Sequence, residues 1–337
     1  MIKEAIAKVV DEVNLTEAEA EAVMHEIMEG QATASQIASY ITALRIKGET
    51  VDEITGSARV MREKAVRIHV NDPFVVDTCG TGGDRMNTFN ISTTTAFVVA
   101  GAGITVAKHG NRSVSSSCGS ADVLKALEVK IDYPPEKVEE CLNTIGIGFL
   151  FAPLYHGAMK HAVGPRQEIG IRTLFNILGP LTNPAQASIQ VLGVYDPNLS
   201  DLMAQVLMNL GSLHCFCVNG LDGLDEITNT TKSKICEGKE GKVKCYHIEP
   251  GDFNLPTARV KDLIGGPPDQ NARTLLDILS GQKGPKRDVV LLNAAPAIVA
   301  AGKARTLQDG IRAAAESIDS GAALEKLNRL RAMTQRP

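Results

Sequence analysis

The chain has 337 residues, enough for two domains that each bury a core, and its 35 basic and 39 acidic side chains leave a net charge of −4. This balance provides no basic field for nucleic acid, and the absence of Trp leaves few platforms for stacking bases. No apolar run reaches the roughly 20 residues of a membrane span, and the amino terminus lacks the pattern of an export signal. We therefore expect a soluble, cytoplasmic protein that acts on small molecules, with no nucleic-acid or membrane partner.

Residues 1–70 show helical periodicity and no strand pattern. Three runs fit the capping box, in which a Thr and a Glu or Gln three residues later cap a helix start: they begin at Thr16, Thr33 and Thr50. These runs predict several short helices with apolar faces. Such a unit packs on its neighbour or on a second copy of itself, and we expect it to form a small all-helical domain.

From residue 71 onward, β-branched runs alternate with helical ones, which is typical of a parallel sheet covered by helices. The more polar segment 238–260 indicates a hairpin or an irregular excursion. We therefore expect a larger α/β domain with a central, mostly parallel sheet flanked by helices. The predicted strands are 74–76, 104–106, 149–151, 189–194, 215–218 and 289–292, and the predicted helices begin near residues 93, 118, 135, 200 and 295.

The alternation is interrupted between residues 158 and 185, where the pattern is helical and contains no strand. We expect helices within about 158–185 to return to the amino-terminal layer and complete the helical domain of residues 1–70. The α/β domain would then comprise residues 71–157 and 186–337, and the active cleft would lie between the two.

The first candidate for a binding site is the glycine-rich run Asp77-Thr-Cys-Gly-Thr-Gly-Gly-Asp84, which follows a predicted strand. Glycines let backbone N–H groups approach an anion without a Cβ in the way. The following Asn90-Ile-Ser-Thr93 offers hydroxyl groups where a helix should begin. The glycine spacing fits neither a dinucleotide fingerprint nor a P-loop, which argues against hydride transfer and against an NTPase.

A second polar run, Lys108-His-Gly-Asn-Arg-Ser-Val-Ser-Ser116, also lies between a predicted strand and a predicted helix. Lys108 and Arg112 offer positive charge, and Ser120 is a plausible cap and phosphate donor at the next helix. Lone basic residues are mostly solvated, but glycine and serine surround these two. Two such loops predict a ligand rich in phosphate.

Two adjacent carboxylates, Asp225 and Glu226, follow the predicted strand 215–218. Ligands of open α/β sheets bind at the carboxyl ends of strands, and oxygen donors beside phosphates suit Mg²⁺. An exposed acidic loop is the alternative interpretation. The position after two phosphate loops favours a metal site.

Three further side chains have open interpretations. Arg166 is either a surface charge or a bidentate partner for a substrate carboxylate. His109 and His156 are each either a proton acceptor or a packed polar side chain. The histidines and cysteines show neither metal-ligand spacing nor a nucleophilic triad, and seven cysteines without paired spacing predict reduced thiols.

With these residues in place, the chain resembles the family of phosphoribosyltransferases that join anthranilate to phosphoribosyl pyrophosphate in tryptophan biosynthesis. The resemblance covers essentially the whole chain, in the family's order and spacing. It rests on the runs 77–84, 90–93, 108–112, 119–122, 175–184 and 223–226.

The resemblance implies a glycosyltransferase of the nucleoside-phosphorylase type, homodimeric through its helical domain and dependent on Mg²⁺. It implies catalytic roles for Lys108, Asp225 and Glu226, and a metal site at Ser92, Asp225 and Glu226. It implies anthranilate contacts at Gly80, Asn111, His156, Arg166 and Pro180. The residues implied to bind phosphoribosyl pyrophosphate are Gly80, Gly83, Asp84, Thr88, Asn90, Ile91, Ser92, Thr93, Lys108, His109, Gly110, Asn111, Arg112, Ser113, Val114, Ser115, Ser116 and Ser120.

Two alternatives share this architecture. A pyrimidine nucleoside phosphorylase has a related glycine-rich loop but uses phosphate to split a nucleoside, and both the Asp225-Glu226 pair and the run 176–184 argue against it. A non-enzymatic relative that binds nucleic acid predicts a basic face and loss of the carboxylate pair. The sequence shows the opposite on both counts.

Overall fold

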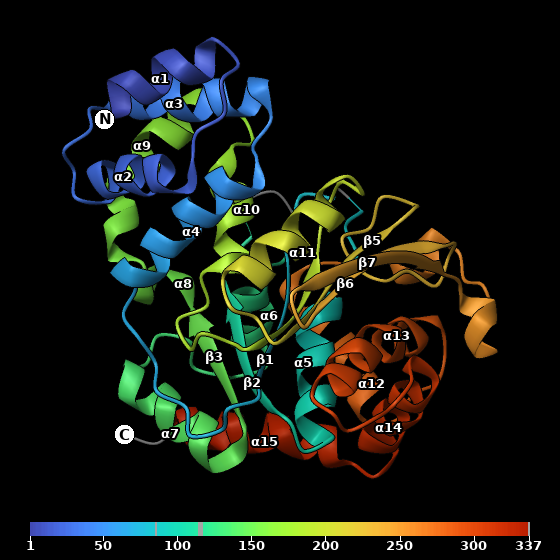
Figure 1. Ribbon diagram of the computed structural model, residues 1–337. Coiled ribbons are helices and arrows are strands. Elements are labelled where there is room, and N and C mark those ends of the chain that lie inside the picture. Colours follow the sequence, from blue (N-terminus) through green and yellow to red (C-terminus); the bar gives the residue numbers. More distant parts are fainter. Residues whose placement is uncertain (85, 114–116, 336–337) are drawn as a thin grey trace.

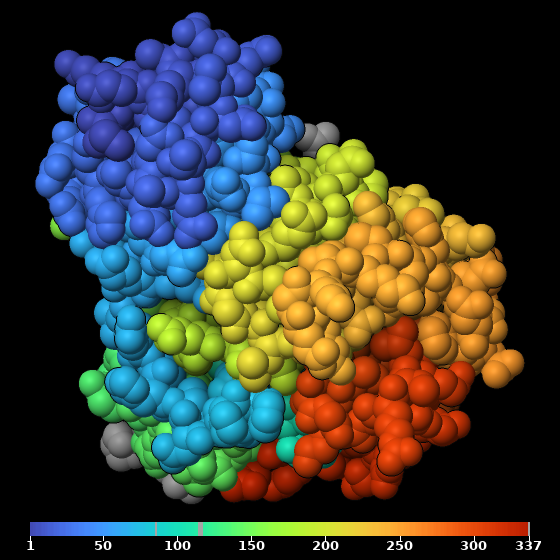
Figure 2. All heavy atoms as spheres, viewed as in Figure 1, coloured from blue at the N-terminus to red at the C-terminus, as the bar shows by residue number. Residues whose placement is uncertain are grey.

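The structure is a computed structural model that describes residues 1–84, 86–113 and 117–335. The predicted contacts Val114, Ser115 and Ser116 therefore lie outside the described residues. A layer of helices stands at one end of a larger body that is built on one sheet (Figures 1 and 2). This arrangement confirms the predicted fold class. Within the described part of the chain, none of the helices is both long and apolar enough to cross a membrane.

The elements follow the chain from the helical layer into the body. The strands are β1 (Val75–Gly80), β2 (Thr105–Gly110), β3 (Ile147–Phe151), β4 (Ile189–Gly193), β5 (His214–Gly220), β6 (Ser233–Lys239) and β7 (Lys242–Ile248). The helices are α1 (Ile2–Val10), α2 (Glu17–Met28), α3 (Ala34–Lys47), α4 (Val51–Lys64), α5 (Ile91–Gly101), α6 (Ser120–Ala126), α7 (Pro135–Ile145), α8 (Ala152–Tyr155), α9 (Lys160–Ile169), α10 (Leu174–Leu178), α11 (Leu199–Asn209), α12 (Pro268–Leu279), α13 (Pro285–Ala300), α14 (Leu307–Asp319) and α15 (Ala322–Gln335). Short 3₁₀ turns are η1 (Gly157–Met159), η2 (Gly179–Leu181), η3 (Pro250–Phe253) and η4 (Val260–Leu263).

The sheet has seven strands in the order β3-β2-β1-β4-β5-β6-β7. The first five are parallel, and β6 and β7 add an antiparallel edge. On one face, Ile189 and Val191 of β4 join the core formed with α5 and α12 to α15, whereas Leu192 and Val194 face α11 and the second core. Burial on both faces explains why consecutive residues of β4, such as Val191 and Leu192, are both apolar.

The predicted strand 289–292 is wrong, because these residues lie inside α13. Its Val-Val-Leu-Leu run is buried within a helix of 16 residues, which begins with Pro285 in its first turn. A short apolar run cannot be assigned to a strand or to a buried helix by periodicity alone. The helix expected near residue 295 is the second half of the same element. The other five predicted strands are confirmed, with boundaries that move by a few residues.

The polar segment from residue 238 is largely a hairpin. Strands β6 and β7 pair with Lys239 opposite Lys242, and the two turn residues Glu240 and Gly241 both have positive φ, as a two-residue hairpin requires. This register places Cys236 opposite Cys245, and the two form a disulfide with a Cα–Cα distance of 4.1 Å. The prediction that all cysteines are reduced is wrong for this pair, because only the hairpin register brings them together. The other five cysteines are free and buried.

The helical layer contains α1 to α4, and the three predicted capping boxes are present at Thr16, Thr33 and Thr50. Helix α9, from the interruption in the strand pattern, packs against α2 and α3 (Figure 1). Arg62 of α4 ties the layer to the body. Its buried guanidinium donates to the carbonyl oxygens of Leu181 and Leu210 at 2.6 and 3.1 Å, and burial lowers its pKa to about 10.

Candidate active site

Five parallel strands end at one edge of the sheet, and four of them end in a glycine: Gly80, Gly110, Gly193 and Gly220. At Gly80 an added Cβ would lie 2.5 Å from Oδ2 of Asp225, and at Gly193 it would collide with the Asp225 backbone carbonyl. The acidic loop after β5 therefore lies so close to the ends of β1 and β4 that no side chain fits at Gly80 or Gly193. This close approach builds the site at the carboxyl ends of the strands, where α/β sheets bind ligands.

The glycine-rich loop is bonded directly to the acidic loop. The Gly82 amide donates to Oδ2 of Asp225 at 2.8 Å, and the Thr81 amide donates to the Gly193 carbonyl at 2.9 Å. Gly82 and Gly83 both have positive φ, of 67° and 81°, which glycine adopts without strain. The sequence therefore folds this loop back onto Asp225.

Three carboxylates meet at this edge. Burial, followed by the neighbouring charge of Asp84, raises the pKa of Asp225 to about 7. Burial and then Asp225 raise the pKa of Glu226 well above its usual value, although Lys108 and a hydrogen bond with the Ser92 backbone oppose that shift. The structure thus brings together Ser92, Asp225 and Glu226, the three predicted metal ligands, beside Asp84. An oxygen-only set with surplus negative charge fits a hard divalent cation.

Lys108 lies at the base of the site. Its side chain is buried, and Nζ donates to the Thr78 carbonyl at 2.5 Å. The ammonium also opposes the rise that burial causes in the pKa of Asp77 and of Glu226. Lys108 is therefore held inside the protein among carboxylates. The alternative interpretation was a solvated lysine at the surface.

Sequence reasoning gave no role to Asp77, which is fully buried behind Lys108. It accepts hydrogen bonds from Nδ2 of Asn183 at 2.9 Å and from the His109 amide at 3.2 Å. Burial raises its pKa to about 6, with Lys108 and these donors opposing the shift. Through these hydrogen bonds Asp77 links β1, in which it lies, to β2 and to the segment after α10. Its only signal in the sequence is that it begins the glycine-rich motif.

The second loop folds onto the start of α6. Oδ2 of Asp122 accepts from the amides of Gly119 and Ser113 at 2.9 and 3.2 Å, and Oγ of Ser120 donates to the Asn111 carbonyl at 3.2 Å. The Arg112 guanidinium lies 5.9 Å from the centre of the Phe151 ring. Asp122 thus organises the loop by bonding its backbone.

Predicted contacts continue from the first loop into the first turn of α5. Thr88 forms an isolated bridge with Ile264, and Asn90 stands at the start of α5, followed by Ile91 and the buried Thr93. Both side-chain atoms of Asn90 already have protein partners. Asn90 is therefore a structural link as much as a candidate ligand contact.

The two histidines face each other: Nε2 of His109 and Nε2 of His156 are 3.3 Å apart. Burial lowers the pKa of His156 to about 4, and burial together with His156 lowers the pKa of His109 well below its usual value. Both are therefore neutral near pH 7. A hydrogen bond between His109 and the Gly179 backbone places the pair next to Pro180 of η2.

Arg166 stands apart from this group, on α9. Its guanidinium lies over the Phe175 ring at 5.2 Å from the centre, and partial burial lowers its pKa. The long side chain is held against an aromatic face, which leaves its planar fork available for a carboxylate.

Arg172 and Tyr195 belong to the site and were not predicted. Arg172, between α9 and α10, donates through Nη2 to the Gly83 carbonyl and lies 4.5 Å from the centre of the Tyr195 ring. The Tyr195 amide donates to Oγ1 of Thr81 at 3.2 Å. These contacts fix the glycine-rich loop to Arg172, which lies in the helical segment 158–185, and to Tyr195, which follows β4. No local pattern in the sequence marks either residue.

Comparison with known proteins agrees with this geometry. A family model described as the glycosyl transferase family, a/b domain, matches residues 72–324, and one described as the helical bundle domain of the same family matches residues 3–65. The chain belongs to this glycosyl transferase family.

Within that family, an anthranilate phosphoribosyltransferase of Moorella thermoacetica is 58% identical over 327 residues, which cover 97% of this chain and 96% of that protein. The crystal structure of the Thermus thermophilus anthranilate phosphoribosyltransferase superposes with a TM-score of 0.94 at 40% identity, covering 98% of this chain and 99% of that one. The Saccharomyces cerevisiae enzyme in complex with PRPP and Mg superposes with a TM-score of 0.88 at 28% identity, covering 99% and 97% of the two chains. The chain is thus a member of the anthranilate phosphoribosyltransferase group.

Proposed function

We propose that this protein transfers the 5-phosphoribosyl group of phosphoribosyl pyrophosphate to the amine of anthranilate, which gives N-(5-phosphoribosyl)anthranilate and pyrophosphate in tryptophan biosynthesis. The observation that carries this proposal is the hydrogen bond from the Gly82 amide to Asp225. It places a loop suited to phosphate directly against carboxylates suited to a metal ion. A pyrophosphate ester bound with Mg²⁺ needs both in one place.

In this proposal Ser92, Asp225 and Glu226 would hold Mg²⁺ next to the phosphate-binding loops. When bound, the ion neutralises charge on the leaving pyrophosphate. Lys108 supplies a second positive charge, held in place at the base of the site by its bond to the Thr78 carbonyl. The loops after β1 and β2 bind the phosphates through their amides and hydroxyls.

Anthranilate would lie between Arg166 and the phosphoribosyl group. The amine nitrogen forms a bond to the anomeric carbon, the bond from that carbon to pyrophosphate oxygen breaks with its electron pair, and the amine releases one proton. Because an aromatic amine is unprotonated near neutral pH, the protein mainly aligns the two reactants, which can lower the barrier by about 7 kcal/mol or more. Exclusion of water protects the activated sugar from hydrolysis.

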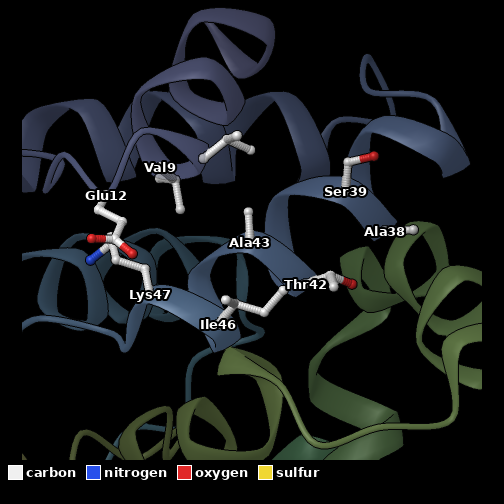
Figure 3. A pocket seen from close by; sticks show the side chains of 9 residues that line it. Val9, Glu12, Ala38, Ser39, Thr42, Ala43, Ile46 and Lys47 are labelled. Atoms are coloured by element: carbon white, nitrogen blue, oxygen red, sulfur yellow. The ribbon is translucent and has the colours of Figure 1, made fainter.

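We also propose a homodimer through the helical layer. A groove of about 480 Å³ lies between α1 and α3 (Figure 3). Its lining combines the apolar Val9, Val10, Ala38, Ala43 and Ile46 with the polar Glu12, Ser39, Thr42 and Lys47. Its rim exposes Val10 at 65% and Ile46 at 81% of their surface. Exposed apolar side chains gathered on one face favour association with another protein surface. The helical unit in this proposal comprises residues 1–70 with helices from about 158–185, and the phosphorylated substrate favours a cytoplasmic location.

The direct test of the reaction is the loss of anthranilate fluorescence on adding phosphoribosyl pyrophosphate, with and without Mg²⁺. The control is thymidine with phosphate, the substrates of a nucleoside phosphorylase of the same architecture. We expect Mg²⁺-dependent loss of fluorescence and an unchanged control. Cleavage of thymidine with no loss of anthranilate fluorescence would reject the proposal.

A further inference from the structure

Asn271, in the first turns of α12, is buried and bonds to two other segments. Its Oδ1 accepts from the Gly266 amide at 2.8 Å, and its Nδ2 donates to Oδ1 of Asn90 at 3.0 Å. Asn90 in turn donates through Nδ2 to the Cys118 carbonyl at 3.1 Å. Three consecutive hydrogen bonds therefore run from the carboxy-terminal part of the chain, through the loop after β1, to the loop after β2.

The direction of this chain of bonds is determined by its ends. A backbone amide such as that of Gly266 can only donate, and a backbone carbonyl such as that of Cys118 can only accept. Each side-chain amide between them is left with one orientation: Asn271 must present its oxygen to Gly266, and Asn90 must present its nitrogen to Cys118. Oδ1 of Asn90 accepts from Nδ2 of Asn271 at 3.0 Å and, at the longer distance of 3.4 Å, from the Cys118 thiol, so the Asn271 amide forms the shorter of the two bonds that keep Asn90 turned toward the second loop.

The packing around Asn271 leaves little room for another arrangement. A Cβ added at Gly265 would lie 2.8 Å from Oδ1 of Asn271 and 2.7 Å from the Phe89 amide nitrogen. Oγ of Ser117 donates to the Gly266 carbonyl at 3.2 Å, which gives the second loop another tie to the same segment. The 265–266 backbone therefore serves as a fixed base for both loops.

The two ends of the Asn90 link stand next to the proposed phosphate contacts. Asn90 lies two residues before Ser92, at the start of α5, and Cys118 lies two residues before Ser120, at the start of α6. We propose that Asn271 is a positioning residue that acts through Asn90 to set the spacing of these two loops for phosphoribosyl pyrophosphate. The inference rests on the site assignment made above, and it concerns a residue that does not touch the substrate.

The test is a double-mutant cycle with Asn271→Asp and Asn90→Ala, followed by steady-state kinetics for both substrates. The Asn271→Asp change keeps the size of the side chain and an acceptor for Gly266 but removes the donor to Asn90. We expect N271D to raise the KM for phosphoribosyl pyrophosphate about tenfold, with kcat and the KM for anthranilate changed less than about twofold. In the N90A background the same substitution should change little, because its partner is gone.

Asn271→Ala provides a second variant without the added charge, and Ser317→Ala is the matched control. Ser317 is also buried and donates to the Val98 carbonyl of α5 at 2.7 Å, so its loss removes a buried hydrogen bond from α5 away from both loops. The control should keep the wild-type KM values. The proposal is overturned if N271D and N271A leave the KM for phosphoribosyl pyrophosphate unchanged, or if their effect is as large in the N90A background as in the wild-type background. Normal turnover by the wild type separates such a result from a failure of the assigned reaction.

Discussion

Oδ2 of Asp225 accepts a hydrogen bond from the Gly82 amide at 2.8 Å, although 143 residues separate them in sequence. This hydrogen bond joins the glycine-rich loop to the Asp225-Glu226 pair, so a shift in the position of one also shifts the other. Gly80 and Gly193 lack side chains, and this allows the two loops to approach so closely.

Replacing Asp225 by Asn together with Glu226 by Gln removes both carboxyl groups from the proposed metal site while keeping the size of the side chains. We expect turnover to fall by at least about two orders of magnitude and the remaining rate to lose its dependence on Mg²⁺. Rates measured across a Mg²⁺ titration check this. A double variant with the wild-type response to Mg²⁺ would remove these residues from the metal site.

Replacing Arg166 by Ala removes the proposed partner of the anthranilate carboxylate. The apparent KM for anthranilate should rise about tenfold or more, because a bidentate charged hydrogen bond is lost. Aniline, which has no carboxylate, should be used equally poorly by the variant and the wild type. If the variant lost activity equally toward both amines, Arg166 would not be the carboxylate partner.

Replacing Arg172 by Gln releases the Gly83 carbonyl from the guanidinium and removes the contact with Tyr195. We expect the KM for phosphoribosyl pyrophosphate to rise about fivefold to tenfold, because the glycine-rich loop loses the hydrogen bond that fixes Gly83. Arg172→Lys should recover part of the effect, since it keeps a donor but not the planar group. A rise confined to the KM for anthranilate would instead make Arg172 a contact of that substrate.

The histidine pair should make stability depend on pH. The pKa of His156 is about 4 in the folded protein and about 6.5 when unfolded, so the unfolded chain binds more protons between these values. The free energy of unfolding should therefore fall as pH drops through this window, by up to ~3 kcal/mol for a shift of this size. Asp77 acts in the opposite sense, because its raised pKa favours folding at the acid end.

Comparison with His156→Gln isolates the histidine contribution, because Asp77 is present in both proteins. Urea unfolding at several pH values between about 4 and 6.5 should give a shallower decline toward acid for the variant. Equal slopes in the two proteins would mean that His156 titrates normally in the folded state.

Replacing Ile46 by Glu places a charge at the rim of the groove in the helical layer, where the side chain is 81% exposed. Light scattering coupled to size exclusion should show a dimer for the wild type and a monomer for the variant, with unchanged helix content. Thr42→Ser, at a residue that lines the same groove, is a mild control that should stay dimeric. A monomeric wild type would contradict the proposed association.

Much of the fold could be predicted from the sequence because its signals are local. Capping boxes at Thr16, Thr33 and Thr50 mark helix starts, and five β-branched runs became strands. The run 289–292 could not be assigned, because a helix buried on most sides carries the same apolar residues as a buried strand. Cys236 and Cys245 became partners only through the register of a hairpin.

The residues of the candidate site likewise fall into those that the sequence could predict and those that it could not. Residues next to the glycine and serine runs could be proposed because phosphate binding has a local chemical pattern, and Asp225 and Glu226 because they follow a strand. Asp77, Arg172 and Asn271 act through contacts with residues distant in sequence. Such contacts depend on the packed fold, so no pattern within one segment could reveal them.

In the proposed mechanism the glycine-rich loop and the Asp225-Glu226 pair bind phosphoribosyl pyrophosphate and Mg²⁺ as one unit. The most direct measurement is calorimetric titration of the protein with phosphoribosyl pyrophosphate in the presence and absence of Mg²⁺, for the wild type and for the Asp225→Asn, Glu226→Gln variant. We expect tight binding of phosphoribosyl pyrophosphate only by the wild type in the presence of Mg²⁺. Equal binding by both proteins, or binding that does not depend on Mg²⁺, would contradict it.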